Sequence, residues 1–491
     1  MNTVTRRSFL TFMLGLMACS GCSTVAPSSN KDKKLYILHI NDVHGFIKPS
    51  ESAIGYAKIG GFIEQFKALH PNTIVLDAGD AYAGSAHAAL DKGAGVLQLQ
   101  NTLELDAMTA GNADFTLGIK LLKERAAAAN FTILSANMMG ADGKPLLKTG
   151  IVLTTNAGLK VGVLGLTLPL SRTADYYSLD IVEAAKAEVA RLRQQADVIV
   201  ALTHLGDGKK DKETSLRIAR EVPGINVIID GHSHSILPEG RVENGVLIAQ
   251  AGEYSKFVGL VELELDGAKT VAAKASLFDH AFFKDAPEKA KTAVVQEHVL
   301  AKNNLVLGTV VGATSVFLNG RRNELRVGET TAGNLMADAV REIGNAEIGL
   351  VITGQIGGEI KPGNITREDV MTLVRINGKL ATVEAPGKSI VAALQKLTGV
   401  WPEPHGMFCQ VSGISFTLDA TNKDNKLSNI RVAGKPIQDN KIYTVCCTAS
   451  IAQNSIKNGT NVRSAGTLED ALLAYLKKHS PVATKVENRI H

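Results

Sequence analysis

Polar side chains that can bind metal ions occur in five short stretches, each at the end of an apolar, strand-like run. The set comprises Asp42, His44, Asp80, Asn112, His204, His232 and His234. In NDVHG and in GHSH the Asp or His side chains are spaced i and i+2, so in an extended chain they point to the same side. One such residue alone is usually a turn former, a helix cap or a structural histidine. Five successive strand ends are hard to explain in that way, and seven mixed oxygen and nitrogen ligands suit two divalent metal ions that share one carboxylate.

These stretches need a scaffold that brings strand ends together, and residues 34–261 predict one. Apolar runs such as LYILHI, TIVLD and VIVAL alternate with helix-like runs such as VEAAKAEVARLRQQA. Nearly continuous apolar strands separated by helices indicate an α/β domain with a buried sheet. The polar residues fall at the carboxyl ends of the strands, where open α/β sheets place their sites. VLIAQAGEYSKFVGLVELELDG is predicted to form a hairpin that closes this domain.

A second α/β domain is predicted to follow a charged amphipathic connecting helix. TTAGNLMADAVREIGN has a Thr candidate for its N-cap, and KSIVAALQKL and LEDALLAYLKKH are further predicted helices. GISFTLD and KIYTVCCTA are predicted strands.

The chain begins with the layout of an export signal, a basic MNTVTRR followed by the apolar SFLTFMLGLMA. Arg6-Arg7 fits either a twin-arginine signal or a general-secretion signal with two incidental arginines. Cys22, or alternatively Cys19, is the predicted lipidation site. We therefore expect an exported protein on the periplasmic or cell-surface face of a bacterial membrane, held by a lipid anchor. The predicted division is a signal peptide 1–22, a tether 23–33, a metal domain 34–285, a connecting helix 286–304 and a second domain 305–491.

Bulk composition excludes several other classes. A net charge of +5 over 491 residues, without a basic run that carries aromatics, argues against nucleic acid as a partner. We expect a monomer that contacts membrane only through its lipid anchor. Cys409, Cys446 and Cys447 are too few for a disulfide framework. They are predicted to be buried strand residues, with a single bridge from Cys409 to either of the others as the alternative.

The order D-x-H, G-D, G-N, H and G-H-x-H resembles the signature of the calcineurin-like metallophosphoesterases. AQAGEYSKFVG, TTAGNLMADAV, GNITREDV and GMFCQVSGISFTLD further resemble the bacterial 5′-nucleotidase family, over residues 34–490. The resemblance implies a four-layer metallophosphoesterase sandwich and a smaller C-terminal α/β substrate-binding domain. It also implies hydrolysis of nucleotide phosphomonoesters in the cleft between the two domains.

The resemblance also implies a role for each ligand. One metal ion would be held by Asp42, His44 and His234, the second by Asn112, His204 and His232, and both by Asp80. The catalytic residues, acting through the metals, would be Asp80, Asn112 and His204. Two such ions can activate a water molecule and clamp phosphoryl oxygens, and mixed ligation suits Mn²⁺, Zn²⁺, Fe²⁺ or Co²⁺.

The stretch GNADFTLG departs from the family pattern. Ala113 stands where the family has a His after the ligand Asn, and Thr116 stands where an Asp orients that His. A positioned general acid contributes about 10²–10⁴-fold, so the resemblance implies impaired ester hydrolysis, another reaction on the same metals, or a substitute His. His87 is the nearby candidate, and a solvated loop His is the alternative. The sulfur-oxidation thiosulfohydrolases of this superfamily keep a similar dimetal site without that His.

The second domain departs as well. The substrate-gripping Arg of the family falls on Gly357, and Arg367 and Arg375 are close to it in sequence. Phe408 is predicted either to stack on a base or to be a core residue.

We therefore predict a dimetal phosphoesterase of the 5′-nucleotidase type that hydrolyses a small phosphorylated substrate, preferably a nucleotide, with a metal-activated water. One alternative is a surface lipoprotein that binds a phosphorylated ligand without turning it over. The other is a dimetal hydrolase with a non-nucleotide substrate.

Overall fold

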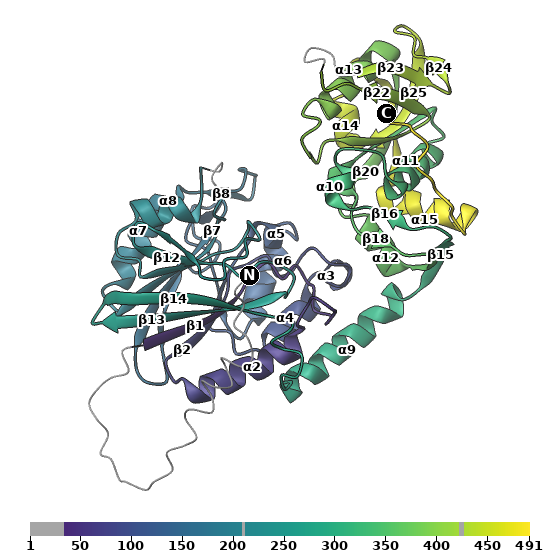
Figure 1. Ribbon diagram of the computed structural model, residues 1–491. Coiled ribbons are helices and arrows are strands. Elements are labelled where there is room, and N and C mark those ends of the chain that lie inside the picture. Colours follow the sequence, from purple (N-terminus) through teal and green to yellow (C-terminus); the bar gives the residue numbers. More distant parts are fainter. Residues whose placement is uncertain (1–33, 209–211, 422–426) are drawn as a thin grey trace, which may run out of the picture. The chain divides into compact units, whose positions relative to one another are not determined.

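The computed structural model describes residues 34–208, 212–421 and 427–491, so the predicted signal peptide, Cys19, Cys22 and the tether lie outside the described residues. The chain divides into two compact units, Met1–Asn303 and Asn304–His491 (Figure 1). Helix α9 (Ala290–Leu307) spans the boundary and lies where the connecting helix was predicted. Within the described part of the chain, no helix is long and apolar enough to cross a membrane.

The first unit contains two six-stranded sheets that pack face to face. The first sheet has the order β14-β13-β1-β2-β3-β4, with bounds Lys269–Asp279, Phe257–Asp266, Lys34–Ile40, Thr73–Asp77, Ala107–Thr109 and Thr132–Leu134. The second has the order β11-β12-β10-β9-β7-β6, with bounds Arg241–Glu243, Val246–Ala249, Val227–Ile229, Val198–His204, Lys160–Thr167 and Gly150–Thr154. Side chains alternate along a strand, so Leu35 and Ile37 of β1 enter the core between the sheets beside Val200 of β9.

Helices cover the outer face of each sheet. Helices α2 (Tyr56–Leu69), α4 (Ala94–Gln100) and α6 (Ile119–Ala128) pack on the first sheet through a core that includes Phe62, Leu99 and Leu122. Helices α7 (Ile181–Leu192) and α8 (Ser215–Glu221) pack on the second. The shorter elements of this unit are α3 (Ala86–Asp91), α5 (Asn112–Phe115), β5 (Met138–Gly140) and β8 (Tyr176–Ser178). The predicted four-layer sandwich is confirmed.

Parallel pairing places the site-bearing strand ends together. Strands β1, β2, β3 and β4 are parallel neighbours, and so are β7, β9, β10 and β12. The carboxyl ends of parallel strands lie at one edge of a sheet, and five of these ends precede the predicted ligands.

The predicted hairpin in VLIAQAGEYSKFVGLVELELDG is wrong. Strand β12 belongs to the second sheet, where it pairs antiparallel with β11, and β13 belongs to the first, where it pairs antiparallel with β1 and β14. Both runs are apolar because both strands are buried, and apolarity does not specify the sheet in which a strand pairs. The segment between them crosses from one sheet to the other and brings Glu253 to the predicted ligands.

The second unit is built on a mixed five-stranded sheet of order β21-β17-β25-β20-β26. Its strands are Cys409–Ser412, Ile348–Ile352, Ile442–Thr448, Lys379–Pro386 and Thr460–Thr467. One face packs on α11 (Thr331–Ile343), α12 (Arg367–Leu373) and α15 (Leu468–His479). The other packs on α13 (Gly387–Thr398), α14 (Ala449–Asn454) and the small sheet β22-β23-β24 (Ile414–Leu418, Leu427–Val432, Lys435–Pro436). Thr330 caps α11, as predicted, by accepting a 3.1 Å hydrogen bond from the Gly333 N–H.

Shorter elements complete the second unit. They are β15 (Val310–Thr314), β16 (Leu318–Asn319), α10 (Arg322–Leu325), η1 (Thr353–Gln355), β18 (Glu359–Ile360) and β19 (Gly363–Thr366).

The three cysteines of the second unit are free and buried. Cys409 lies on β21 and pairs with one side of β17, whereas Cys446 and Cys447 lie on β25 and pair with its other side. A strand therefore separates the two positions, and the alternative of a disulfide from Cys409 is wrong. Burial raises the pKa of the Cys409 and Cys446 thiols to about 12, so they stay protonated and unreactive.

Candidate metal centre

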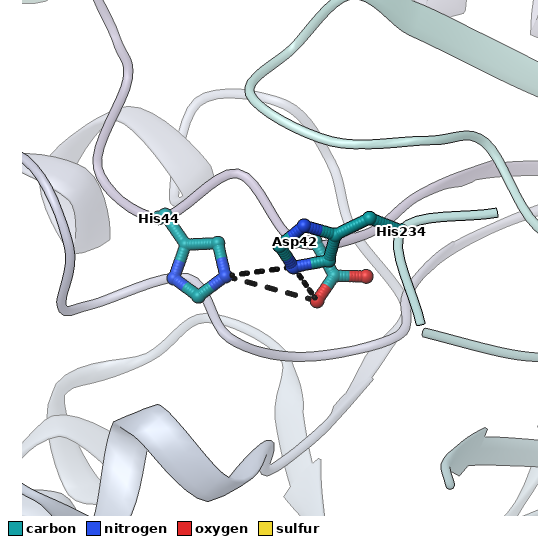
Figure 2. A group of neighbouring side chains, drawn as sticks. All are labelled: Asp42, His44 and His234. Atoms are coloured by element: carbon teal, nitrogen blue, oxygen red, sulfur yellow. Dashed lines mark hydrogen bonds and ion pairs between the residues drawn. The ribbon is translucent and has the colours of Figure 1, made fainter. Parts of the chain in front are cut away.

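Strand ends from both sheets meet at one cluster of ligand atoms. His234 Nε2 lies 3.4 Å from Asp42 Oδ1 and 3.2 Å from His44 Nε2, and the three side chains converge (Figure 2). A second group joins Asp42 to Asp80 and His204. Each group brings three ligand atoms within the span that one cation could occupy, and Asp42 belongs to both.

Asp80 reaches toward both groups. Its Oδ2 atom lies 3.3 Å from His204 Nε2 and 3.6 Å from His44 Nε2. Its Oδ1 atom accepts a 2.7 Å hydrogen bond from the Ala113 N–H, which ties the β2 end to the turn after β3. A carboxylate in this position can lie between two cations.

The remaining two predicted ligands, His232 and Asn112, lie next to residues of the same cluster. The backbone N–H of His232 donates to the Asp42 carboxylate at 3.0 Å, and its ring centre lies 5.4 Å from that of His204. Asn112 opens α5 directly before Ala113, and its Oδ1 atom is buried without a hydrogen-bond partner in the described chain. His204 Nε2 is likewise buried without one. Buried polar atoms are nearly always satisfied, so these two unsatisfied atoms fit ligands of a metal ion.

Three histidines have one ring nitrogen held by the protein, so the other faces the cluster. The Nδ1 atoms of His204 and His44 lie 2.7 Å from the Ala78 carbonyl and 2.8 Å from the Ala83 carbonyl, so each Nδ1 carries the donated proton. Glu253 holds His234 Nδ1 in the same way, at 2.5 Å. Metal-binding histidines are typically oriented by such a second hydrogen bond.

The backbone at the site is strained. Five of the seven residues have a positive φ, in a region that non-glycine residues rarely adopt. The values are 50° for Asp42, 50° for His44, 55° for Asp80, 79° for His232 and 56° for His234. Each such residue costs about 1–3 kcal/mol and persists only where the surrounding structure imposes it, which is typical of functional sites.

Glycines allow the strand ends to approach one another. A β-carbon at Gly111 would lie 2.1 Å from Asp80 Oδ1, and one at Gly231 would lie 2.8 Å from His204 Nδ1. Any side chain at either position would therefore displace a candidate ligand.

The carboxylates make the cluster strongly attractive to cations. Burial opposes protonation of His204, but Asp80 and Asp42 outweigh it and raise its pKa to about 10. Burial is outweighed in the same way at His234, where Asp42 and Glu253 raise the pKa to about 9. Metal ligands must be deprotonated, so a divalent cation that enters here displaces protons from the histidines.

Three supporting residues were missed in the sequence, although each adjoins a motif. Asn41 donates to Asp42 Oδ2 at 2.8 Å, and Glu253 orients His234. Asp114 accepts hydrogen bonds from four backbone N–H groups, those of Gly111, Asp80, Ala81 and Tyr82. Each is a polar residue within two positions of a candidate ligand or within AQAGEYSKFVG, and that proximity in sequence was the available signal.

The family's His and the Asp that orients it are replaced here by Ala113 and Thr116, and Thr116 makes only a local structural contact. Thr116 is exposed, and its hydroxyl donates to the Ala113 carbonyl at 2.6 Å within the same turn. His87 is 4% exposed and lies on helix α3, so the alternative of a solvated loop histidine is wrong. Asp77, at the end of β2, has a structural role, since it accepts hydrogen bonds from the Gly79 N–H and the Gln100 amide.

Three residues of the second unit, Phe408, Arg367 and Arg375, were singled out by the comparison with the family pattern. Phe408 is 2% exposed and packs in the core of this unit, which agrees with the core interpretation and not with base stacking. Arg367 is ion-paired with Glu469. The aliphatic stem of Arg375 covers Gly357, because a β-carbon there would lie 3.5 Å from Arg375 Cβ.

A four-layer α/β sandwich with Asp, His and Asn at its strand ends, around two candidate cation positions, defines a metallophosphoesterase. Family models agree: the calcineurin-like phosphoesterase model matches residues 35–235, and the 5′-nucleotidase C-terminal domain model matches residues 310–457. The chain belongs to the 5′-nucleotidase family, with a metallophosphoesterase domain followed by a 5′-nucleotidase C-terminal domain.

Individual relatives match most of this chain. The 5′-nucleotidase of Diplobatis ommata is 27% identical over 554 residues, which cover 97% of this chain and 92% of that protein. The trifunctional nucleotide phosphoesterase protein YfkN of Bacillus subtilis (strain 168) is 29% identical over 439 residues, and the match spans 79% of this chain and 29% of that longer protein. The crystal structure of a 5′-nucleotidase precursor from Thermus thermophilus has a TM-score of 0.76 at 26% identity, and the match covers 93% of this chain and 99% of that one.

Proposed function

We propose that this protein is a dimetal phosphoesterase that hydrolyses phosphate monoesters, with nucleotides as the preferred substrates. The observation that carries the proposal is the clustering of carboxylate and imidazole atoms, which come from Asp42, His44, Asp80, His204 and His234. Two unsatisfied buried ligand atoms, Asn112 Oδ1 and His204 Nε2, fit bound metal rather than a purely structural cluster.

Two divalent cations, when bound, would polarise the phosphoryl group and activate a water molecule. Asp42, His44 and His234 would hold one cation, and Asn112, His204 and His232 the other, with Asp80 shared. Mn²⁺, Zn²⁺, Fe²⁺ and Co²⁺ all suit this donor set. Ala113 offers no proton to the leaving oxygen, so we expect slow turnover of esters whose leaving group needs protonation.

The first experiment measures phosphate release by the mature protein loaded with Mn²⁺. The panel contains nucleoside monophosphates, sugar phosphates and an aryl phosphate, whose good leaving group needs no protonation. Asp80→Asn is the blank, because it removes the negative charge of the carboxylate that lies close to both His204 and His44. Release above the blank, with a nucleoside monophosphate hydrolysed faster than the sugar phosphates, supports the proposal. No release from any ester, with two equivalents of metal bound, would falsify it.

A second candidate function is favoured by the residues that stand in place of the family's His and Asp, Ala113 and Thr116. The Thr116 hydroxyl is used within its own turn, so neither it nor Ala113 replaces the missing acid. This favours a dimetal hydrolase with a non-nucleotide substrate, or a protein that binds a phosphorylated ligand without turnover. Ala113→His combined with Thr116→Asp separates these alternatives. A gain in nucleotide hydrolysis supports a nucleotide site that lost its acid, and no gain in a metal-loaded variant supports the second candidate.

We also propose export and lipid anchoring, which rest on the sequence of residues 1–22 alone. Fractionation of cells that produce Cys22→Ala tests the anchor, with Cys19→Ala as the matched control. Loss of membrane association only in Cys22→Ala supports the assignment, and unchanged membrane association in both variants contradicts it.

A further inference from the structure

We infer that Asp207 is a positioning residue of the candidate metal centre, because it holds the turn that carries His232 and His234. Asp207 lies in the loop after β9, and its side chain is 12% exposed. It does not belong to the seven candidate ligands and acts on them through other side chains. The inference rests on the proposed dimetal centre and adds to it a residue outside the ligand set.

The Asp207 carboxylate binds the two serines that alternate with the histidines in the sequence HSHS, residues 232–235. Its Oδ1 atom accepts a 2.7 Å hydrogen bond from the Ser233 hydroxyl and a 2.6 Å hydrogen bond from the Ser235 hydroxyl. The Asp207 backbone N–H also donates to Ser233 Oγ, at 3.3 Å. Short hydrogen bonds from a hydroxyl to a carboxylate are roughly twice as strong as those between neutral groups. One carboxylate therefore clamps both serines of the turn.

Gln250 holds the backbone of the same turn. This residue directly follows β12 and is fully buried. Its Oε1 atom accepts from the Ser235 backbone N–H at 2.5 Å. Its amide nitrogen donates to Ser233 Oγ at 3.0 Å and to the Gly231 carbonyl at 3.3 Å. The turn is thus fixed from β12 through its backbone and from the loop after β9 through its serine side chains.

The turn needs such support because its backbone is strained. The φ angles are 79° for His232 and 56° for His234, in a region that non-glycine residues rarely adopt. Conformations of this kind persist only where surrounding contacts impose them. Each serine is a direct neighbour of a histidine in the chain, so hydrogen bonds that fix the serines also restrict the backbone of the two candidate ligands.

Arg241 of β11 fixes the orientation of the Asp207 carboxylate. Its guanidinium donates to the Asp207 carbonyl at 3.4 Å and lies 3.8 Å from Oδ2, which leaves Oδ1 for the serines. Asp207 therefore ties the end of β9 to the turn after β10. Since the two histidines are proposed to bind different cations, the loss of Asp207 is expected to weaken both cation positions.

The test is a calorimetric titration of Mn²⁺ into the metal-stripped, full mature chain. Asp207→Ala should weaken the binding of both Mn²⁺ equivalents by about 10–100-fold, the usual effect of removing a partner behind a metal ligand. Asp207→Asn should keep most of the affinity, because its amide oxygen can still accept from the serine hydroxyls. The exposed Asp175→Ala is the matched control and should leave the affinity unchanged. Urea denaturation of the metal-free variants separates a loss of metal affinity from a loss of fold.

A double-mutant cycle tests the path through the serines. Ser233→Ala combined with Ser235→Ala should cost about as much affinity as Asp207→Ala. Adding Asp207→Ala to that double variant should cost little more, because residues of one hydrogen-bond network do not contribute additively.

Four outcomes would overturn the inference. They are unchanged Mn²⁺ affinity in Asp207→Ala, the same loss in Asp207→Asn as in Asp207→Ala, additive losses in the cycle, and an equal loss in Asp175→Ala. The titration records metal binding alone, so a failure of ester hydrolysis in the first experiment would leave its result intact. A parent protein that binds no Mn²⁺ would overturn this inference and the proposed function together.

Discussion

Residues that contact the candidate ligands from outside the cluster determine how far the candidate centre is pre-organised before a metal ion binds. Glu253 contacts His234 Nδ1 at 2.5 Å and so leaves Nε2 directed at Asp42 and His44. It arrives on the segment that crosses between the sheets. Such an outer carboxylate fixes the ring orientation and raises the basicity of the ligand.

Glu253→Gln should therefore weaken Mn²⁺ binding by about 10–100-fold, measured by calorimetric titration of the metal-stripped protein. The substitution keeps the size of the side chain but removes its charge. The exposed Glu239→Gln serves as the control. Equal metal affinity in the two variants would show that Glu253 does not position His234.

His39 is a buried histidine within strand β1 that the proposed chemistry does not use. Both of its ring nitrogens are buried without a hydrogen-bond partner among the described residues. Burial lowers its pKa to about 3 from the ordinary value of 6.5. The unfolded chain thus binds a proton between these pH values that the folded chain does not, and the free energy of unfolding falls as pH decreases through this window.

His39→Leu should remove about 1.4 kcal/mol per pH unit from the pH dependence of the unfolding free energy between about pH 4 and 6. Urea denaturation of the metal-stripped protein at several pH values measures the slope. His298→Gln, at an exposed position, is the control. An unchanged slope in His39→Leu would mean that His39 is not buried in its neutral form.

At the scale of elements, the Asp114 carboxylate holds the short helix α5 and the loop after β2 together. Asp114 is 0% exposed and accepts from the N–H groups of Gly111, Asp80, Ala81 and Tyr82. It thereby joins the two segments that carry the candidate ligands Asp80 and Asn112. Glycine at position 111 permits the close approach of the two segments, because a β-carbon there would lie 2.5 Å from the Asp80 backbone N.

Asp114→Ala should lower the free energy of unfolding by about 3 kcal/mol, because it leaves buried N–H donors unsatisfied. Urea denaturation followed by circular dichroism gives the value. The exposed Asp175→Ala should change it by no more than about 0.5 kcal/mol. A loss of similar size in both variants would contradict the structural role of Asp114.

At the scale of the whole molecule, all seven predicted ligands lie in the first compact unit. A cation that binds the native state stabilises it by mass action, about 2.7 kcal/mol at a concentration 100 times Kd. The second unit has its own sheet and its own cores, so it is expected to gain nothing directly from metal.

Mn²⁺ should therefore raise the midpoint of one of two calorimetric unfolding transitions and leave the other in place. Asp80→Asn should remove most of that shift, whereas Asp175→Ala should preserve it. Equal shifts of both transitions would show that the two units unfold together and that stabilisation is shared between them.

Much of this organisation was accessible from the sequence because it is local. The i and i+2 spacing in NDVHG and GHSH places polar side chains on one side of an extended chain wherever the chain lies. Apolar patterning likewise predicted the buried strands and the α/β class, and the Thr at the start of TTAGNLMADAVREIGN predicted the N-cap of α11. These patterns depend on neighbours in the chain and not on which segments pack together.

The other features of the fold and of the site were decided by the tertiary structure alone, because they depend on contacts between segments that are distant in sequence. The assignment of β12 and β13 to different sheets, the path that brings Glu253 to His234, and the separation of Cys409 from Cys446 by β17 follow from strand pairing. The positive φ angles of five candidate ligands follow from crowding around the centre.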